Sequence, residues 1–309
     1  MARTRQSGGS CVSPYVVRAA LAFALVVPLA TGGCVHPSAT IRAQSLARQN
    51  REDEAVVVLQ QRLAKQPDDV AARRLLIRLL GSTGDLLAAR GQVEELARWL
   101  PPNDPAPSIE LGHALELTHR YDEALGAYDQ AAALAPASPD GPREGGMRAA
   151  RWGELEQARP RLEEALRRGA SDAETWHTLG LVRLHLEDYD GAADAYRAGA
   201  ARDPRCAECW LGLASVGLVS GDPQLALDAY ERVIALTPRF ASAQLGRAWA
   251  LAQLGRKLEA ARALDTAQEL GAPPGPIAKQ RAALASPAAP LAPSPPGTEA
   301  PSGGAQRAE

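Results

Sequence analysis

The chain has 309 residues, of which 46% are hydrophobic and 4% aromatic, and its 34 basic and 36 acidic side chains give a formal net charge of −2. Because nucleic-acid binding depends on clustered Lys and Arg, the absence of a basic excess argues against nucleic acid as the partner. The length alone would fit two globular domains, but a chain built of short repeats adds units without enclosing a larger core.

Residues 1–33 are typical of an export signal. Arg3, Arg5 and Arg18 precede an uncharged run, AALAFALVVPLA over 19–30, which has the length of a signal-peptide core and is too short to span a bilayer. The run is followed by LATGGC, in which small residues lead directly to Cys34. This segment resembles the lipobox of a bacterial lipoprotein signal. The resemblance implies that the chain is cut before Cys34, which then carries the lipid.

The residue after Cys34 bears on the membrane that the lipid would enter. It is Val35, and not the Asp that would resemble an inner-membrane retention signal, so we expect an outer-membrane anchor that faces the periplasm. The alternative is an ordinary secretory signal cut near Gly32, which would leave Cys34 as a spare thiol and the protein soluble in the periplasm or secreted.

From residue 36 onward a pattern recurs at a spacing of 34 residues, with one step of 35 between Ala89 and Ala124. In the stretch 173–206, apolar and small residues lie three and four apart, which predicts two amphipathic helices joined at Glu187 and Asp188. Other units repeat a small residue in each helix, with Ile77 as an exception in the first helix, and a terminating proline. The small residue that opens the second helix recurs at Ala55, Ala89, Ala124, Ala158, Ala192, Ala226 and Ala260. The proline recurs at Pro67, Pro101, Pro136, Pro204 and Pro238, with Ala170 and Ala272 in its place in two units.

These features together resemble the tetratricopeptide repeat (TPR) family. The motif is W-x2-L-G, a small residue opening the second helix, an aromatic residue four positions later and a final proline. The resemblance implies an all-α fold, a right-handed superhelical solenoid of about seven helical hairpins over 34–274, because one hairpin cannot bury both its faces. The expected units are 36–69, 70–104, 105–138, 139–172, 173–206, 207–240 and 241–274. We expect a capping helix over 275–286 and a disordered, Pro-, Ala- and Ser-rich tail over 287–309.

The fourth unit departs most from the pattern. Gly145 and Gly146 lie inside its first helix, each less favourable than Ala by about 1 kcal/mol, and Pro160 interrupts the opening turns of its second helix. We expect a local soft point here, with faster amide exchange over 140–165 than in the flanking repeats.

Cys206 and Cys209 form a CAEC motif at the entrance to the sixth unit. An exported chain meets oxidising conditions, so we expect the pair to close a local disulfide. The competing hypothesis is a thiol-disulfide or metal-binding protein that uses this pair, since a CxxC at a helix start lowers the pKa of a thiol. However, the sequence has no alternating strand pattern for a thioredoxin-like fold, and zinc would need two further ligands. Haem attachment fails because Trp210, and not a His, follows the motif.

No motif in the sequence supports catalysis. The histidines are scattered without an HExxH pattern, and neither a serine nucleophile elbow nor a phosphate-binding loop is present. We therefore expect no enzyme activity, no cofactor, no bound metal and no small-molecule substrate.

What remains is the surface of the solenoid. The family resemblance implies that first helices line its concave side and that four positions of each unit point into it. The candidate groove residues are Arg74, Arg78, His113 and Glu116, followed by His177, Leu181, Leu184, Leu211, Ser215, Leu218, Leu245 and Trp249. Apolar groups that face an open groove cost solvation free energy, so the row of leucines predicts a docking site for an apolar helix or an extended peptide, with Trp249 as its anchor. In the alternative, a phase error of one residue puts several of them in the core, or the capping helix covers Trp249.

The sequence thus predicts a non-catalytic scaffold of the bacterial cell envelope that holds a protein partner. In architecture it is similar to the repeat lipoproteins that assist pilus or outer-membrane assembly, which is an analogy at the level of the fold. A regulatory module for a separate enzyme is a third interpretation, which the sequence does not distinguish from the scaffold.

Overall fold

The computed structural model describes residues 38–285, in which fifteen α-helices and no strand are found. Cys34, the predicted signal over 1–33 and the predicted tail over 287–309 lie outside the described residues. The helices are α1 (Ala39–Arg48), α2 (Glu52–Lys65), α3 (Val70–Ser82), α4 (Leu86–Trp99), α5 (Ala106–Leu117), α6 (Tyr121–Leu134), α7 (Asp140–Trp152), α8 (Leu155–Arg167), α9 (Ala173–His185), α10 (Tyr189–Arg202), α11 (Ala207–Val219), α12 (Pro223–Leu236), α13 (Ala241–Gln253), α14 (Lys257–Glu269) and α15 (Pro274–Ala285).

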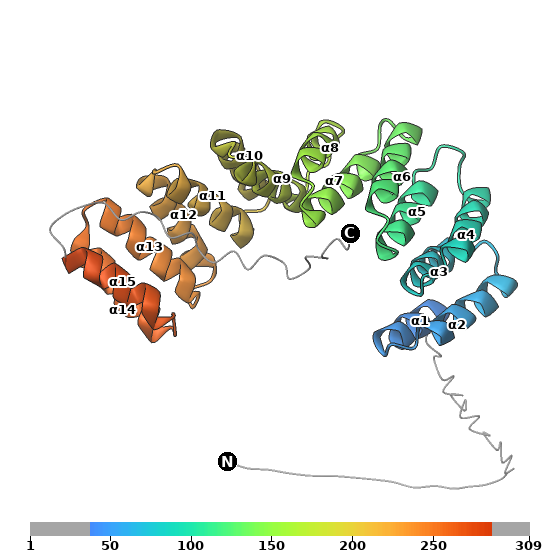
Figure 1. Cartoon of the computed structure of the whole chain (residues 1–309), viewed down its shortest axis with the longest axis horizontal. Helices are drawn as coiled ribbons and strands as arrows, with labels where there is room; N and C mark the ends of the chain where they lie inside the picture. Colours follow the sequence, from blue (N-terminus) through green and yellow to red (C-terminus); the bar gives the residue numbers. More distant parts are fainter. Residues whose placement is uncertain (1–37, 286–309) are drawn as a thin grey trace, which may run out of the picture. The chain divides into compact units, whose positions relative to one another are not determined.

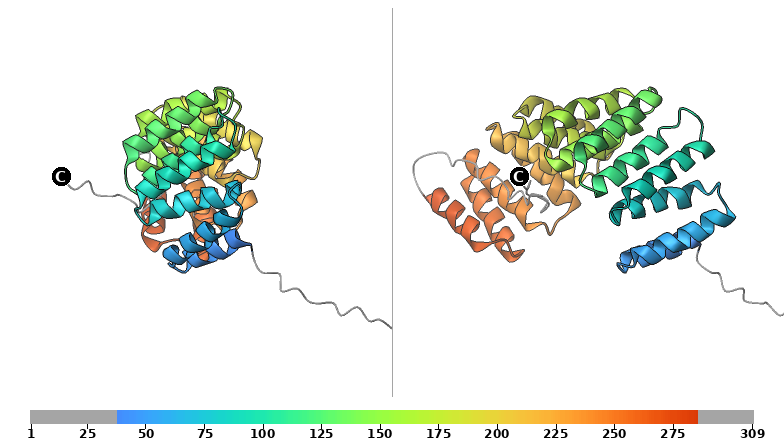
Figure 2. Two further views of the ribbon diagram at one scale, coloured as in Figure 1. Left: turned by 90° about the vertical axis from the view of Figure 1, so that its right-hand side faces the viewer. Right: turned by 45° about the vertical axis from the view of Figure 1, so that its right-hand side comes forward.

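The helices follow one another as stacked hairpins, from α1 with α2 to α13 with α14 (Figures 1 and 2). Within each hairpin the two helices pack together, and the second helix packs on the first helix of the next hairpin. First helices of neighbouring hairpins also touch each other, as α3 touches α5 and α9 touches α11. In Figure 1 α3, α5, α7 and α9 accordingly lie along the inner side of the array. The predicted all-α repeat solenoid is confirmed.

The recurring alanines mark the closest approach between the two helices of each hairpin. All seven, Ala55, Ala89, Ala124, Ala158, Ala192, Ala226 and Ala260, are fully buried. A larger side chain at this position would push the second helix away from its neighbours, because protein interiors are close-packed. The spacing of these alanines in the sequence therefore reports the spacing of the hairpins in the fold.

A second size rule links each first helix to the residue 16 positions later in the second helix. A Cβ at Gly112 would lie 2.5 Å from Tyr128 Cε1, and a Cβ at Gly180 would lie 2.7 Å from Tyr196 Cε1, so at these two positions only glycine fits against the tyrosine ring. In the sixth unit a small residue, Ala214, precedes Tyr230 by the same 16 positions. Ile77, the exception in the sequence pattern, belongs to a buried cluster against which Val93 packs. Val93 is smaller than the tyrosine at this position in the third, fifth and sixth units, so the second helix leaves room for a larger residue on the first.

The turn inside each hairpin uses one residue with a positive φ. These residues are Asn50, Gly84, His119, Gly153, Glu187, Gly221 and Gly255, and they repeat with the same spacing as the hairpins. The left-handed conformation ends the first helix and turns the chain toward the second. The two units that lack the terminating proline stop their second helix in the same way, with Gly169 at φ 101° and Gly271 at φ 86°.

The fourth unit forms two complete helices in spite of its unfavourable residues. α7 runs through Gly145 and Gly146, and α8 runs through Pro160, which is exposed. A Cβ at Gly146 would lie 2.7 Å from Leu162 Cγ, so this glycine permits close contact between the two helices. The cost in helix propensity is therefore offset in part by packing.

The last helix, α15, finishes the solenoid. It packs on α14 and α13, where Ile277 is buried and Gln280 Nε2 donates a hydrogen bond of 3.4 Å to the carbonyl oxygen of Leu245. This helix shields the apolar face that α13 and α14 would otherwise present to water, as the end of a solenoid requires.

Candidate binding surface on the first helices

First helices of units 2 to 5 carry a connected network of charged side chains. Arg74 and Arg78 of α3 lie four residues apart, so they share one face of the helix, and both reach Glu110 on α5. His113 then connects α5 to α7, and Arg143 connects α7 to α9. The network therefore crosses three successive junctions between repeats.

Glu110 is the buried centre of this network. Its carboxylate accepts hydrogen bonds from Arg74 Nε at 2.6 Å, from Arg78 Nε at 2.7 Å and from Arg78 Nη2 at 2.8 Å. Burial raises the pKa of Glu110, but hydrogen bonds from His113 and the two arginines outweigh burial and bring the pKa to about 2. The carboxylate is therefore an anion at neutral pH, although its side chain is fully shielded from water.

His113 bridges two carboxylates that belong to neighbouring repeats. Its Nδ1 lies 3.4 Å from Glu110 Oε2, and its Nε2 lies 3.3 Å from Glu144 Oε2. Burial lowers the pKa of His113, but the hydrogen bonds to both glutamates outweigh burial and raise the pKa above its usual value. The hydrogen bond from His113 lowers the pKa of Glu144 to about 2, against the opposing effect of burial.

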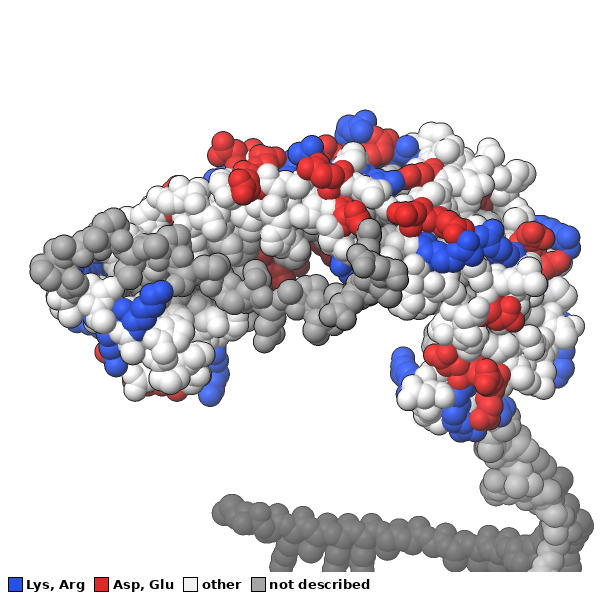
Figure 3. Space-filling model, in the orientation of Figure 1, with Lys and Arg blue, Asp and Glu red and all other residues white. Residues whose placement is uncertain are grey.

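Two arginines of α7 extend the network in both directions. Arg148 Nη2 lies 3.2 Å from Glu144 on the same helix, and Arg148 Nε lies 3.4 Å from Glu116 on α5. Arg143 Nη2 lies 2.9 Å from Glu174 on α9. The network thus contains fixed charges of both signs. On the face of the molecule in view in Figure 3, acidic and basic side chains of the described residues also lie interspersed.

Beyond the network, the first helices α9, α11 and α13 carry apolar side chains. Leu181 is the most exposed of the predicted groove residues in this part, at 37%. Leu184, Leu211 and Leu245 are partly buried and pack against the core cluster of the C-terminal hairpins. Ser215, also on α11, is satisfied within its own helix, because its Oγ donates to the carbonyl oxygen of Leu211 at 3.0 Å.

His177 adjoins these leucines on α9. Its ring packs against Tyr196, with 5.8 Å between the ring centroids, and burial lowers its pKa. Unlike His113, it has no hydrogen-bonded carboxylate to hold a proton, so it favours the neutral form. It therefore extends the uncharged part of the surface.

Two predicted groove residues are instead part of the core. Leu218 and Trp249 are only 4% and 7% exposed, and both belong to the buried cluster that includes Ile277 of α15. The prediction of Trp249 as an exposed anchor is wrong, because α15 packs against α13 where an eighth hairpin would otherwise lie. Replacing either residue with a charged one would disrupt the core and not the surface alone.

Sequence reasoning missed the two glutamates that organise the polar network. Glu110 and Glu144 are not at the groove positions of the family pattern, and their partners lie in other repeats. The one available signal was a charged residue three positions before His113, inside an otherwise apolar helix.

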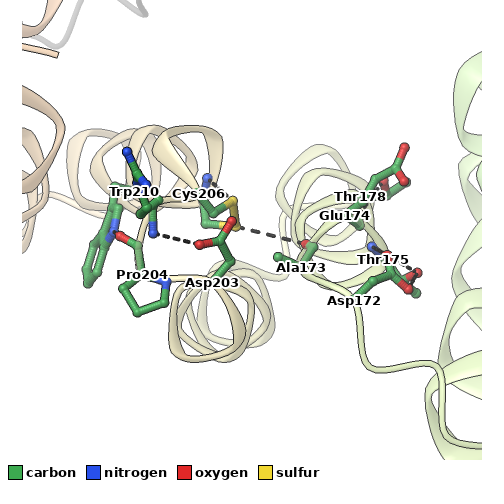
Figure 4. Close-up of a disulfide and its surroundings, with 11 residues drawn as sticks. Asp172, Ala173, Glu174, Thr175, Thr178, Asp203, Pro204, Cys206 and Trp210 are labelled. Atoms are coloured by element: carbon green, nitrogen blue, oxygen red, sulfur yellow. Dashed lines mark hydrogen bonds between the residues drawn. A yellow bond between two sulfur atoms is a disulfide. The ribbon is translucent and has the colours of Figure 1, made fainter. Parts of the chain in front are cut away.

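Cys206 and Cys209 are joined by a disulfide at the start of α11 (Figure 4). Cys206 is the N-cap residue, since its Sγ accepts a hydrogen bond of 3.1 Å from the backbone N–H of Cys209. Both cysteines are buried, and Cys209 Sγ lies 4.0 Å from the carbonyl oxygen of Ala173 on α9. The bond therefore closes the first turn of α11, directly after the turn that leads in from the fifth repeat.

Within residues 38–285, no group of three or more His, Cys, Asp or Glu side chains is arranged to hold a metal ion. In the same range, none of the helices combines the length and the apolar character needed to cross a bilayer.

Comparison with known proteins identifies the repeats. The sequence profile of the family described as Tetratricopeptide repeat matches residues 144–205, 177–238 and 211–275. The predicted repeats of this family are thus confirmed over residues 144–275. A search of curated proteins found no significant match.

Several solved structures share the fold. The structure of YrrB, described as a TPR protein with an unusual peptide-binding site, is 19% identical over 62% of this chain and 97% of its own, with a TM-score of 0.55. The C-terminal part of a TPR repeat-containing protein from Cytophaga hutchinsonii is 17% identical over 75% of this chain and 95% of its own, with a TM-score of 0.57. A structure of the MamA protein is 20% identical over 62% of this chain and 100% of its own, with a TM-score of 0.52. At these identities the likeness shows the fold alone.

Proposed function

We propose that this protein, which is built of tetratricopeptide repeats, is a non-catalytic scaffold that binds a partner protein on the surface of its first helices. The observation that carries the proposal is the run of incompletely buried leucines, Leu181, Leu184, Leu211 and Leu245, on α9, α11 and α13. Apolar side chains left partly exposed in a row lose solvation free energy, which a partner restores by covering them.

The partner that fits this surface is an apolar helix or an extended peptide. The apolar side chains of the partner would cover the leucines. The polar network, which ends beside these leucines at the pair of Arg143 with Glu174, would set the position of the partner along the solenoid. The solved structure of YrrB supports a peptide as the partner, since that protein shares the fold and its description names a peptide-binding site.

We place this scaffold in the bacterial cell envelope. The support is the LATGGC segment that ends at Cys34, which predicts a lipid anchor, and Val35, which favours the outer membrane with the solenoid in the periplasm. In that position the partner would be a component of pilus or outer-membrane assembly. Without the lipid, the same scaffold would be soluble in the periplasm or secreted. Mass spectrometry of the first peptide of the purified protein distinguishes these cases.

The competing function is thiol-disulfide exchange or metal binding by Cys206 and Cys209. A redox-active pair needs an accessible thiolate, whereas Cys209 is fully buried against α9 and α10. The buried pair favours a structural brace, and the scaffold remains our proposal.

The scaffold is tested by affinity capture from bacterial membranes, followed by mass spectrometry of the captured proteins. The variant Leu181→Glu puts a charge on the most exposed leucine of the apolar stretch, and we expect it to lose the partner. Leu258→Glu is the matched control, because Leu258 is a leucine 80% exposed on α14, away from this surface. Equal recovery of the same partner by both variants would contradict the proposal.

A further inference from the structure

The two ends of the solenoid are finished differently. At the C-terminal end α15 covers α13 and α14, whereas within the described residues no helix precedes α1. The first hairpin leaves Ile41 57% exposed on α1 and Val57 49% exposed on α2. An open solenoid end is normally covered by a polar capping surface. Ile41 lacks the cover that a preceding hairpin gives at this position, where Gly212 faces Tyr196 and Gly246 faces Tyr230, whereas Val57 is at a position that is exposed in every hairpin.

The exposed face also contains a shallow cleft of about 310 Å³ between α1 and α2. Leu46, Val57 and Val58 form its apolar part, and charged side chains of both signs, Arg42 and Asp53 among them, form its rim. The face therefore has an apolar centre and no excess of basic residues.

The chain that leads into this hairpin is short. Ser38 is the N-cap of α1, where its Oγ accepts a hydrogen bond of 3.3 Å from the backbone N–H of Ile41. Cys34 lies four residues before Ser38 in the sequence. Four residues span at most about 14 Å when fully extended. A lipid on Cys34 would thus hold the first turn of α1 close to a bilayer.

We propose that Ile41 and Val57 of the first hairpin rest on the surface of the bilayer in which Cys34 is anchored. This inference rests on the proposed lipid anchor. Each lipid-anchored copy has a membrane within about 14 Å of Ser38, the N-cap of this hairpin, at any protein concentration, whereas a second copy of the chain would have to be supplied by diffusion. The anchor already confines the hairpin to the interface. A contact of two apolar side chains is therefore sufficient to keep this face on the bilayer.

The contact gives the scaffold an orientation. The first repeat is held at the membrane, and the partner surface on α9, α11 and α13 begins four hairpins farther along the chain. Since charges of both signs surround the apolar centre, the contact depends little on salt, in contrast to a polybasic membrane site.

The cysteine content of the protein allows a direct test on the full chain. Of its four cysteines, Cys11 is removed with the signal, Cys34 carries the lipid, and the remaining two form the buried disulfide. Ile41→Cys or Val57→Cys therefore provides the single reactive thiol of the processed protein, which is labelled with the environment-sensitive fluorophore NBD. The labelled protein is reconstituted into vesicles of phosphatidylethanolamine and phosphatidylglycerol, with and without brominated acyl chains.

We expect brominated lipid to quench the fluorophore at positions 41 and 57 severalfold more than at the control positions. The controls are Leu87→Cys on α4 and Leu258→Cys on α14, whose leucines are 84% and 80% exposed. Equal quenching at all four positions, in protein that floats with the vesicles, overturns the membrane contact alone. A concentration-dependent change at position 41 in detergent without vesicles would assign the face to a second copy and would overturn it as well. Protein that neither carries lipid nor floats refutes the anchor itself, and the contact falls with it.

Discussion

Arg78 and Glu110 form a two-point ion pair across the junction between the second and third repeats. Arg78 Nε donates to one carboxylate oxygen at 2.7 Å and Arg78 Nη2 donates to the other at 2.8 Å, while the carboxylate is fully buried. The apolar clusters of the second and third repeats meet here, since Ala114 of α5 belongs to the cluster of the first two repeats and Leu86 packs against both clusters. The ion pair therefore adds a directional polar contact to the apolar packing between the two repeats.

The first prediction concerns the removal of this buried charge. Glu110→Gln keeps the shape of the side chain but leaves Arg74, Arg78 and His113 without their shared anion. We expect the free energy of unfolding to fall by about 3 kcal/mol, at the lower end for a broken buried pair, because both arginines can still reach water. Urea denaturation followed by circular dichroism measures the change.

An exposed pair provides the control for this variant. Glu123→Gln breaks the contacts with Arg90 and Arg120, whose side chains are 45% and 48% exposed, and we expect a loss below about 1 kcal/mol. Similar losses for the two variants would mean that burial of Glu110 contributes little.

The second prediction concerns pH and His113. Its pKa is raised in the folded protein, so its contribution to stability is fully present below about pH 6.5 and is lost as the pH rises through the higher folded pKa. Glu110 and Glu144 face His113 from α5 and α7, and Arg148 Nη2 lies 3.4 Å from its Nε2. We expect His113→Gln to remove this decline in the free energy of unfolding above pH 6.5. Denaturation in urea at a series of pH values measures the slope.

At acid pH, the free energy of unfolding depends on Glu110 and Glu144. The pKa values of Glu110 and Glu144 are about 2 in the folded protein against 4.5, so their contribution is lost as the pH falls from about 4.5 toward 2. His177 is the control on the other side, because burial lowers its pKa and its contribution is lost as the pH falls below about 6.5. If His113→Gln and His177→Gln change the profile in the same direction, the assignment of His113 is wrong.

The repeat itself could be predicted from the sequence because it follows from contacts within one hairpin and with the next. Each recurring alanine, such as Ala192, is buried in the same way in every unit. The surface is less predictable because one motif position has different neighbours in different units. Leu181 and Trp249 occupy the same position two units apart, yet only the tryptophan is covered by the cluster that contains α15.

For a related reason, the polar network could not be predicted from the repeat pattern. Glu110 is paired with residues 32 and 36 positions away, and the family motif specifies neither partner. Which charges meet depends on how closely α3 approaches α5, where a Cβ at Gly81 would lie 2.9 Å from Ala114 Cα. That distance is a property of the packed helices and leaves no signature in the spacing of residues.

The third prediction concerns the turn of the fifth hairpin. Glu187 has φ 63°, whereas the equivalent residues of the fourth and sixth hairpins, Gly153 and Gly221, are glycines. A side chain in this conformation costs about 1 kcal/mol, so we expect Glu187→Gly to raise the free energy of unfolding by up to about that amount. Gly221→Ala is the mirror experiment, because nothing lies within 4 Å of the added Cβ and only backbone strain opposes it. It should destabilise by a similar amount, and a loss of stability in Glu187→Gly would contradict the argument.

The fourth prediction separates the role of Cys206 as the N-cap of α11 from its role in the disulfide with Cys209. Its equivalent in the preceding unit, 34 residues earlier, is Asp172, which caps α9 by accepting a hydrogen bond from the N–H of Thr175. We therefore expect Cys206→Asp with Cys209→Ala to be more stable than Cys206→Ala with Cys209→Ala by about 1 kcal/mol, the usual contribution of an N-cap. Thermal unfolding of both double variants measures the difference. Equal stability would show that capping at this site is negligible.

The last prediction concerns Gly146 in the fourth unit. Helix propensity alone favours Gly146→Ala by about 1 kcal/mol, but the new Cβ would lie 2.7 Å from Leu162 Cγ and 3.0 Å from Leu162 N. Forcing α7 and α8 apart costs roughly 1 to 3 kcal/mol, so we expect a net loss of stability.

Gly126 provides the matched control, because it lies exposed on α6 with nothing within 4 Å of an added Cβ. Gly126→Ala should stabilise the protein by close to 1 kcal/mol, since helix propensity alone acts there.

In the unmodified protein Gly145, Gly146 and Pro160 should make amides over 140–165 exchange faster than those of the flanking repeats. Equal protection, together with a stabilising Gly146→Ala, would mean that this unit is neither soft nor tightly packed at its glycines.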